Sequence, residues 1–334
     1  MRIAIVSGVD IDVIRHLEKH HEVIYNLDAK PDVLRNTIQG CDVLVFRSGV
    51  SITAELMAHA PNLGLLVRAG SGLDNIDLEY LKLRDIKLQR IPEPSAQAVG
   101  EMAIALMFAL ARNLREADQK LRQGYWAKLE LESHLLSGKV LGIVGAGNIG
   151  ARTGQLGAAL GMKPMGCVQA STPAIAAELR KKHIQPATFE EVVTNADFLS
   201  IHVPLSDSTR NMINANTFAM MKRGSYLINL ARGGVVDEKA LYQELTKGKR
   251  VRGAAMDVHE REGHGKISPL AELPNVLLTP HIGAMTVETQ QDIGRRAVAM
   301  IEEFALTRSK HKASSLQPGP VQIDPGFQPP AMAD

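Results

Sequence analysis

Short apolar runs alternate with amphipathic stretches along the chain, and this rhythm predicts the fold class. Five runs in the first part of the chain have the length of buried strands: Ile3–Val6, Val23–Tyr25, Val43–Phe46, Leu65–Val67 and Ile86–Leu88. Three stretches between them have helical length and spacing: Asp10–Lys19, Pro31–Ile38 and Thr53–His59. Strands that alternate with helices predict a parallel sheet with helices on both faces.

The same alternation begins again after a long helix, which is predicted from about Ala96 to Gln123. The strands predicted in this second part are Val140–Val144, Met165–Val168, Phe198–His202, Tyr226–Asn229, Gly253–Met256 and Val276–Thr279. A last helix, from about Val287 to Phe304, carries apolar residues on one face and is expected to return to the first sheet. The chain is therefore predicted to be an α/β protein with two doubly wound parallel-sheet domains.

The composition is that of an ordinary globular protein until about Thr307, where prolines begin to recur in a polar tail. We expect this tail to be disordered or to lie on the surface. The 334 residues suit two domains, and the formal net charge of +2 indicates neither a nucleic-acid nor a membrane partner. The apolar run Met102–Ala111 is shorter than the roughly 20 residues of a membrane span. Cys41 and Cys167 are expected to be buried thiols, as in a protein of the reducing cytoplasm.

A glycine-rich turn follows the predicted strand Val140–Val144 directly. Its residues, Gly145-Ala146-Gly147-Asn148-Ile149-Gly150, have the spacing G-x-G-x-x-G and open a helix. Glycines at this spacing permit a tight turn, close approach of the backbone to a pyrophosphate and close packing of helix on strand. The free N–H groups of the helix N-terminus then attract phosphate, so this turn predicts a dinucleotide site.

The residue that usually selects NAD is missing from the next strand. An acidic side chain about 20 positions after the glycines binds the ribose hydroxyls of NAD. Val168 stands where that acid is expected, and Gln169, Ser171 and Thr172 offer only neutral polar groups. No arginine stands there for a 2′-phosphate, so NAD is the predicted cofactor while NADP stays open.

Polar groups with complementary chemistry follow three strands of the second part: Arg232, Asp257 with Glu260 and Glu262, and His281. Ligands of open α/β sheets bind beyond the carboxyl ends of the strands, so these groups are expected to meet. Arginine grips a carboxylate with two parallel bonds, and histidine exchanges a proton with an alkoxide. Each residue also has a plain structural interpretation, as a surface charge or a loop histidine. The remaining histidines and carboxylates form no convincing metal site.

Several stretches together resemble the D-isomer-specific 2-hydroxyacid dehydrogenases: LGIVGAGNIG at 141–150, HVPL at 202–205, NLARGGVVD at 229–237, AMDV at 255–258 and LTPHIG at 278–283. The resemblance implies a Rossmann cofactor domain (99–283) inserted into a flavodoxin-like substrate domain (1–98 and 284–306), with 307–334 as the tail. It also implies a homodimer through the cofactor domain, near the helix 96–123.

The resemblance implies a role for individual residues. The catalytic set is Arg232, Glu262 rather than Glu260, and His281. The substrate contacts are Arg47, Ser48, Ser71, Gly72 and Arg232. The cofactor contacts are Gly145, Gly147, Asn148, Ile149, Gly150, Gln169, His202, Val203, Pro204, Ala231, Asp257, His281 and Gly283. The family glutamate is usually followed by proline, whereas Gly263 stands here.

The substrate is open between two kinds of small D-2-hydroxy or 2-oxo acid. Arg47 resembles one basic residue of the phosphate-contacting loop in the 3-phosphoglycerate dehydrogenase branch, but Gly49 replaces the second. Arg68 is a possible extra cation, and glyoxylate or hydroxypyruvate is the other expectation. A protein of a different class, a non-catalytic NAD(H)-sensing corepressor on the same scaffold, is the alternative to an enzyme.

Overall fold

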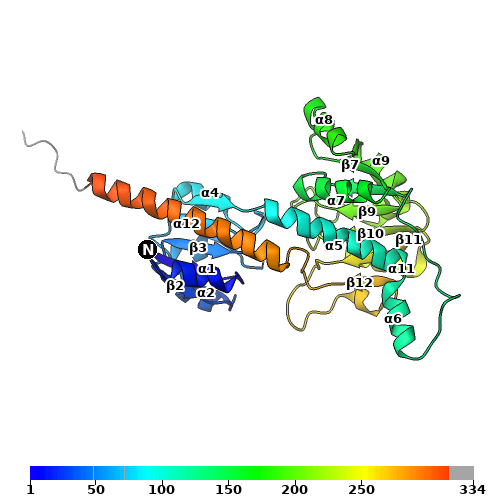
Figure 1. The fold of residues 1–334 in the computed structure, drawn as a ribbon, viewed down its shortest axis with the longest axis horizontal. Coiled ribbons are helices and arrows are strands. Elements are labelled where there is room, and N and C mark those ends of the chain that lie inside the picture. Colours follow the sequence, from blue (N-terminus) through cyan, green and yellow to red (C-terminus); the bar gives the residue numbers. More distant parts are fainter. Residues whose placement is uncertain (48, 71, 316–334) are drawn as a thin grey trace, which may run out of the picture.

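The computed structural model describes the backbone of residues 1–47, 49–70 and 72–315 and contains two parallel sheets (Figure 1). Ser48 and Ser71, both predicted substrate contacts, lie outside the described residues, as does 316–334. The first sheet has the order β2-β1-β3-β4-β5, which is the flavodoxin-like order. Its strands are β1 (Arg2–Ile5), β2 (Glu22–Tyr25), β3 (Val43–Phe46), β4 (Leu65–Arg68) and β5 (Lys87–Arg90). Its helices are α1 (Ile11–Leu17), α2 (Pro31–Ile38), α3 (Ala54–Ala58) and α4 (Leu78–Leu83).

The second sheet has seven parallel strands in the order β12-β11-β10-β9-β6-β7-β8. Strands β7 and β8 are added on one side of β6 and strands β9 to β12 on its other side, so the switch point of the strand order lies between β6 and β9. The strands are β6 (Val140–Val144), β7 (Lys163–Cys167), β8 (Gln185–Pro186), β9 (Phe198–Ile201), β10 (Ser225–Asn229), β11 (Val251–Met256) and β12 (Val276–Leu278). The helices are α7 (Asn148–Ala159), α8 (Pro173–Lys181), α9 (Phe189–Asn195), α10 (Ala215–Met220) and α11 (Glu238–Lys247), with a 3₁₀ turn at Pro269–Glu272. The predicted fold of two doubly wound parallel-sheet domains is confirmed.

The last helix, α12 (Val287–Ser315), returns to the first sheet as predicted. Ile293, Ala297 and Ile301 are buried together with Ile3 and Val43 of that sheet. Figure 1 shows α12, in orange, lying along the lobe of the five-stranded sheet. The N-terminal strands and α12 therefore build this lobe together, while the middle of the chain builds the other.

Two predicted boundaries are wrong. The helix predicted over 96–123 is two helices, α5 (Glu93–Ala111) and α6 (Leu114–Arg122), because Asn113 adopts a left-handed φ of +50° that ends a regular helix. Asn113 Nδ2 also donates to the Glu132 carbonyl at 2.7 Å. The tail predicted from Thr307 is helical as far as Ser315, since this stretch contains no glycine or proline that would end α12.

Helix α5 has enough length and hydropathy to span a membrane over Pro94–Ala111, although the shorter run Met102–Ala111 does not. Half of this segment is buried inside the protein, where Ala103, Met107 and Ala111 join the core under the seven-stranded sheet. The core helix of a globular protein meets the same criteria of length and composition. Both cysteines are buried and free, as the sequence predicted.

Candidate active site

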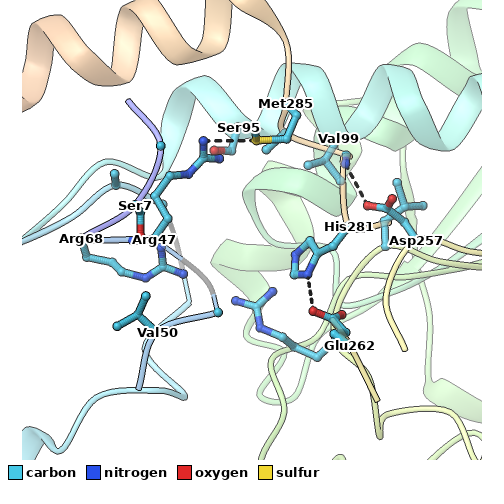
Figure 2. A pocket seen from close by; sticks show the side chains of 18 of the residues that line it. Ser7, Arg47, Val50, Arg68, Ser95, Val99, Asp257, Glu262, His281 and Met285 are labelled. Carbon is cyan, nitrogen blue, oxygen red and sulfur yellow. Dashed lines mark hydrogen bonds and ion pairs between the residues drawn. The ribbon is translucent and has the colours of Figure 1, made fainter. Parts of the chain in front are cut away.

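A cavity of about 450 Å³ lies between the two sheets, and both contribute charged side chains to it. Arg47 and Arg68 come from the five-stranded sheet, while Asp257, Glu262 and His281 come from the other. Figure 2 shows the two arginines on one side of the cavity and the acid–imidazole group on the opposite side. The volume suits a small ligand.

Arg232 follows β10 directly and lines this cavity. Its Nε donates to both carboxylate oxygens of Asp74 at 3.1 Å, and its Nη1 donates to the Ala231 carbonyl at 2.7 Å. A Cβ on Gly72 would collide with Nη2, so a larger residue there would displace the guanidinium from this position. One edge of Arg232 is thus held by the protein, and the Nη2 end lies beside the Gly72 backbone.

His281 and Glu262 form a pair, with His281 Nδ1 3.0 Å from Glu262 Oε2. His281 has a left-handed φ of +56°, which is uncommon for a residue with a side chain. The backbone is held there by Asp257, whose carbonyl accepts from His281 N at 2.7 Å. The Asp257 carboxylate accepts from the backbone N–H groups of Ile282 and Gly283 at 2.9 and 2.8 Å. The buried Asp257 therefore fixes the loop that presents the imidazole.

The second oxygen of Glu262, Oε1, accepts from the backbone N–H of His259 at 3.2 Å. Burial raises the pKa of Glu262, but the hydrogen bond and the charge of His281 outweigh it and leave this pKa below its ordinary value. The carboxylate is therefore ionised at neutral pH. Gly263 has a φ of +116°, which proline cannot adopt, so this loop requires glycine where the family usually has proline.

Protein groups hold both arginines of the opposite wall, of which Arg68 is buried and Arg47 is half-buried. Arg47 Nη1 bonds to Gln290 Oε1 and lies 3.3 Å from Met285 Sδ. Arg68 is 3% exposed, lies 5.7 Å above the Phe46 ring, and donates from Nε to the Gly72 carbonyl at 3.0 Å.

Partial or full burial lowers the proton affinity of both guanidinium groups. Burial lowers the pKa of Arg47 below its ordinary value. Burial, helped by the charges of Arg232 and Arg47, lowers the pKa of Arg68 to about 10. Both side chains remain charged at neutral pH, so this wall presents two cations to the cavity.

The glycine-rich turn has a shape that fits a dinucleotide. Gly145 has a φ of +92°, and a Cβ at Gly150 would collide with the Gly145 carbonyl. An added Cβ at Gly147 would meet no atom within 4 Å, so that position faces open space. Gly147 precedes α7, whose first turn has no side-chain cap, and the N–H groups of Asn148 and Ile149 are available for a phosphate.

The other predicted cofactor residues surround this turn. His202 and Val203 follow β9 and pack against Gly145, while exposed Pro204 continues the same loop. Burial lowers the pKa of His202 to about 4, so its ring is neutral at pH 7. Its Nε2 forms a hydrogen bond with Ser200 Oγ at 2.9 Å. Exposed Gln169 lies just beyond β7. Ala231 N donates to Asn229 Oδ1 at 3.0 Å within the turn after β10.

Sequence reasoning missed three residues that hold the predicted ones in place. Asp74 holds Arg232, and Gln290 and Met285 of the α12 region hold Arg47. Asp74 lies within the stretch Ala69–Asp77 that resembles the family, which was the available signal. The contacts of Gln290 and Met285 with Arg47 could not be predicted from the sequence, because nothing in their spacing points to a residue more than two hundred positions away.

Comparison with known proteins identifies the class of protein that this fold and site define. The NAD-binding domain of the D-isomer-specific 2-hydroxyacid dehydrogenases matches residues 104–283. A D-lactate dehydrogenase from Aquifex aeolicus, solved in complex with NAD and lactic acid, superposes with a TM-score of 0.82 at 27% identity, over 93% of this chain and 97% of that one.

Two curated relatives are more similar in sequence. A hydroxypyruvate reductase of Thermotoga maritima is 41% identical over 81% of this chain and 87% of its own length. A D-3-phosphoglycerate dehydrogenase of Methanocaldococcus jannaschii is 36% identical over 91% of this chain but only 57% of its own length. The chain thus spans little more than half of the latter relative. It belongs to the D-isomer-specific 2-hydroxyacid dehydrogenase family and is an NAD-dependent oxidoreductase.

Proposed function

We propose that the protein reduces a small 2-oxo acid to the D-2-hydroxy acid, and catalyses the reverse oxidation, with Arg232, Glu262 and His281 as the catalytic set. The observation that carries this proposal is the presence of all three side chains in one cavity, at the carboxyl ends of neighbouring strands. A pure binding protein on this scaffold would have no use for that combination.

The roles follow from the geometry of each group. The free Nη2 end of Arg232, beside the backbone of Gly72, binds the substrate carboxylate and polarises the adjacent carbonyl. Bound NADH supplies the hydride for the carbonyl carbon. His281 donates a proton to the carbonyl oxygen from Nε2, because Nδ1 faces Glu262. Glu262 orients the imidazole and stabilises its charged form, and Asp257 fixes the backbone beneath it.

The glycine-rich turn would hold the pyrophosphate of the cofactor through Gly147, Asn148 and Ile149. Gln169 would meet the adenine ribose, and Asp257, His281 and Gly283 would meet the nicotinamide end. The end of β7 presents neutral side chains, and neither repels nor binds a 2′-phosphate. NAD is the cofactor of the family domain that this chain matches, and the neutral end of β7 leads us to propose that NADP is also accepted.

For the substrate, we propose a 2-oxo acid with a second anionic group, such as a phosphorylated hydroxypyruvate. Arg47 and Arg68 support this choice, because two cations on the wall opposite His281, one half-buried and one buried, are suited to bind a dianionic group. Hydroxypyruvate itself is the second candidate, since a relative that this chain matches over 87% of the relative's length is a hydroxypyruvate reductase.

We also propose a homodimer through the region around α6. Six large apolar side chains there are more than half exposed: Leu114, Leu121, Tyr125, Trp126, Leu129 and Leu135. Exposed apolar residues in one segment are typical of an interaction surface. Light scattering should give the mass of two chains, and Trp126→Glu should lower the measured mass towards that of one chain.

We place this dimer in the cytoplasm, because a reducing compartment suits free, buried thiols.

The proposed function is tested by following the absorbance of reduced nicotinamide with phosphohydroxypyruvate, hydroxypyruvate, glyoxylate and pyruvate. NADH and NADPH are each supplied in turn. We expect turnover with at least one acid, and fastest turnover with the phosphorylated one. Tight binding of NADH with no turnover on any of these acids would instead favour the corepressor-like alternative.

A further inference from the structure

Glu238 is a buried carboxylate that lies near the active site and takes no part in the chemistry proposed above. It is the first residue of α11 and is 4% exposed. Its Oε1 accepts from the backbone N–H of Glu260 at 2.8 Å, and its Oε2 accepts from Ser268 Oγ at 2.8 Å. The N-terminus of α11 favours a negative charge at this position, so the carboxylate is stabilised in its buried site.

The partners of Glu238 stand near the two ends of one loop, residues 259–268, which carries Glu262. A reciprocal bond runs from Glu238 N to Glu260 Oε1 at 3.2 Å. The His259 carbonyl also packs against Gly233, where a Cβ would collide with it. The Glu238 side chain thus attaches both ends of this loop to α11, and separate backbone packing holds the His259 end against the turn that follows Arg232.

The interior of the loop is held mainly by contacts within the loop: Glu262 Oε1 accepts from His259 N at 3.2 Å, and Lys266 N donates to the Gly263 carbonyl at 3.2 Å. Residues 260–267 are exposed, and Gly263 and Gly265 have left-handed φ values of +116° and +74°. Glycine has wide conformational freedom, so the path of the backbone here depends on where its ends are held. Glu262 lies between the two anchors, and its carboxylate must stay within hydrogen-bond distance of His281.

We propose that Glu238 is a positioning residue, which acts through Glu262 by fixing the loop that brings this carboxylate to His281. The inference rests on the proposed roles of Glu262 and His281 and adds a residue that does not touch substrate or cofactor. Loss of Glu238 should therefore lower kcat for 2-oxo acid reduction. The KM for the 2-oxo acid should change little, because Arg232 is held by other contacts.

The test is a double-mutant cycle of Glu238→Ala and Glu262→Gln, measured as kcat and KM with NADH and the best 2-oxo acid. If Glu238 acts only through Glu262, Glu238→Ala should lower kcat about tenfold in the wild-type background and less than about twofold in the Glu262→Gln background. An equal loss in both backgrounds would overturn the proposal and assign Glu238 a general structural role.

Two further variants keep the test interpretable. Glu238→Gln preserves the volume and one acceptor oxygen, so it should fold and retain kcat within about threefold. Glu244→Ala is the matched control, because Glu244 lies on the same helix and accepts from the N–H groups of Arg250 and Val251 at the amino end of β11. It should lower the melting temperature and leave kcat unchanged.

The outcomes also separate this inference from the proposed function. If Glu262→Gln and His281→Ala both retain wild-type turnover, the proposed catalytic set is wrong whatever Glu238 does. If those two variants lose activity while Glu238→Ala keeps the wild-type kcat, the catalytic set stands and the positioning role is wrong.

Discussion

The two walls of the cavity hold their charged groups by different means. On the wall of the seven-stranded sheet, carboxylates bind backbone N–H groups: Asp257 holds the loop of His281, and Glu262 holds His259. On the opposite wall, Arg47 and Arg68 are long side chains held by a glutamine, a thioether and one carbonyl. On the first wall these carboxylates fix the backbone of a loop. On the second wall the backbone is held by β4 and by Ser7 Oγ, which accepts from Arg47 N at 2.9 Å, and the contacts named here hold only the guanidinium ends.

This difference matches the demands of the two proposed tasks. Proton transfer requires the imidazole within hydrogen-bond reach of the carbonyl oxygen, so its loop must be held closely, even at a left-handed φ. Recognition of a second anionic group depends on electrostatic attraction, which weakens only gradually with distance. We therefore expect changes on the first wall to abolish chemistry and changes on the second to alter the choice of substrate.

The largest effect should come from His281. His281→Ala removes the proposed proton donor and should lower kcat about 10³-fold with every 2-oxo acid. NADH binding, measured by calorimetry, should persist, and the exposed His16→Ala variant serves as a control with wild-type kcat. Wild-type turnover by His281→Ala would remove the basis for assigning the chemistry to this wall.

The next largest effect concerns Arg232, which connects the walls through Asp74. Arg232→Ala should lower kcat/KM about 10²-fold by removing the carboxylate contacts. Arg232→Lys should recover little of this loss, because an ammonium group cannot form two parallel bonds. Steady-state kinetics would contradict this assignment if lysine restored the wild-type KM.

The wall that carries Arg47 and Arg68 offers the sharpest test of the comparison between the two walls. Changing Arg47 and Arg68 together to methionine should lower kcat/KM for phosphohydroxypyruvate about 30-fold while changing that for glyoxylate less than about threefold. The ratio of the two specificity constants is the measurement. An equal loss with both acids would mean that these arginines support the cavity rather than select the substrate.

Cofactor choice should respond more modestly, at a place remote from both walls. Val168→Asp places an acid at the end of β7 and should raise the NADH-to-NADPH ratio of kcat/KM about tenfold, mainly through repulsion of the 2′-phosphate. Gln169→Asp, one position along, is the matched comparison. An unchanged ratio in both variants would place the adenine ribose elsewhere.

The smallest expected effect concerns Asp74. Asp74→Asn keeps an acceptor for Arg232 Nε but removes the carboxylate charge, and should change the KM for the 2-oxo acid about threefold with kcat retained. Asp74→Ala removes the acceptor as well and should raise the KM further. Identical KM values in both variants and the wild type would show that Arg232 needs no partner.

Local sequence patterns predicted the parts of the molecule that depend on local rules. The two sheets follow from alternating strands and helices, and the glycine-rich turn follows from a backbone geometry that glycine alone permits. Arg232, Asp257 and His281 could be grouped because parallel strands end at one edge of a sheet. None of these inferences required knowledge of how the two sheets face each other.

The contacts between distant parts of the chain could not be predicted in this way. Arg232 and Asp74 are separated by 158 positions, and Arg47 and Gln290 by 243, so no periodicity connects them. The break between α5 and α6 depends on the left-handed backbone of Asn113, which the apolar pattern does not signal. Glu238 would be taken for an ordinary acidic residue in the first turn of a helix.

The most direct test of the account follows a deuterium label from the cofactor to the substrate. The enzyme is incubated with NADH that carries deuterium at C4 of the nicotinamide, on one face and then on the other, together with hydroxypyruvate or its phosphorylated form. The account predicts that one of the two labelled cofactors places deuterium on C2 of the product, and that chiral chromatography shows the D acid. Product without deuterium from both cofactors, or the L acid, would contradict it.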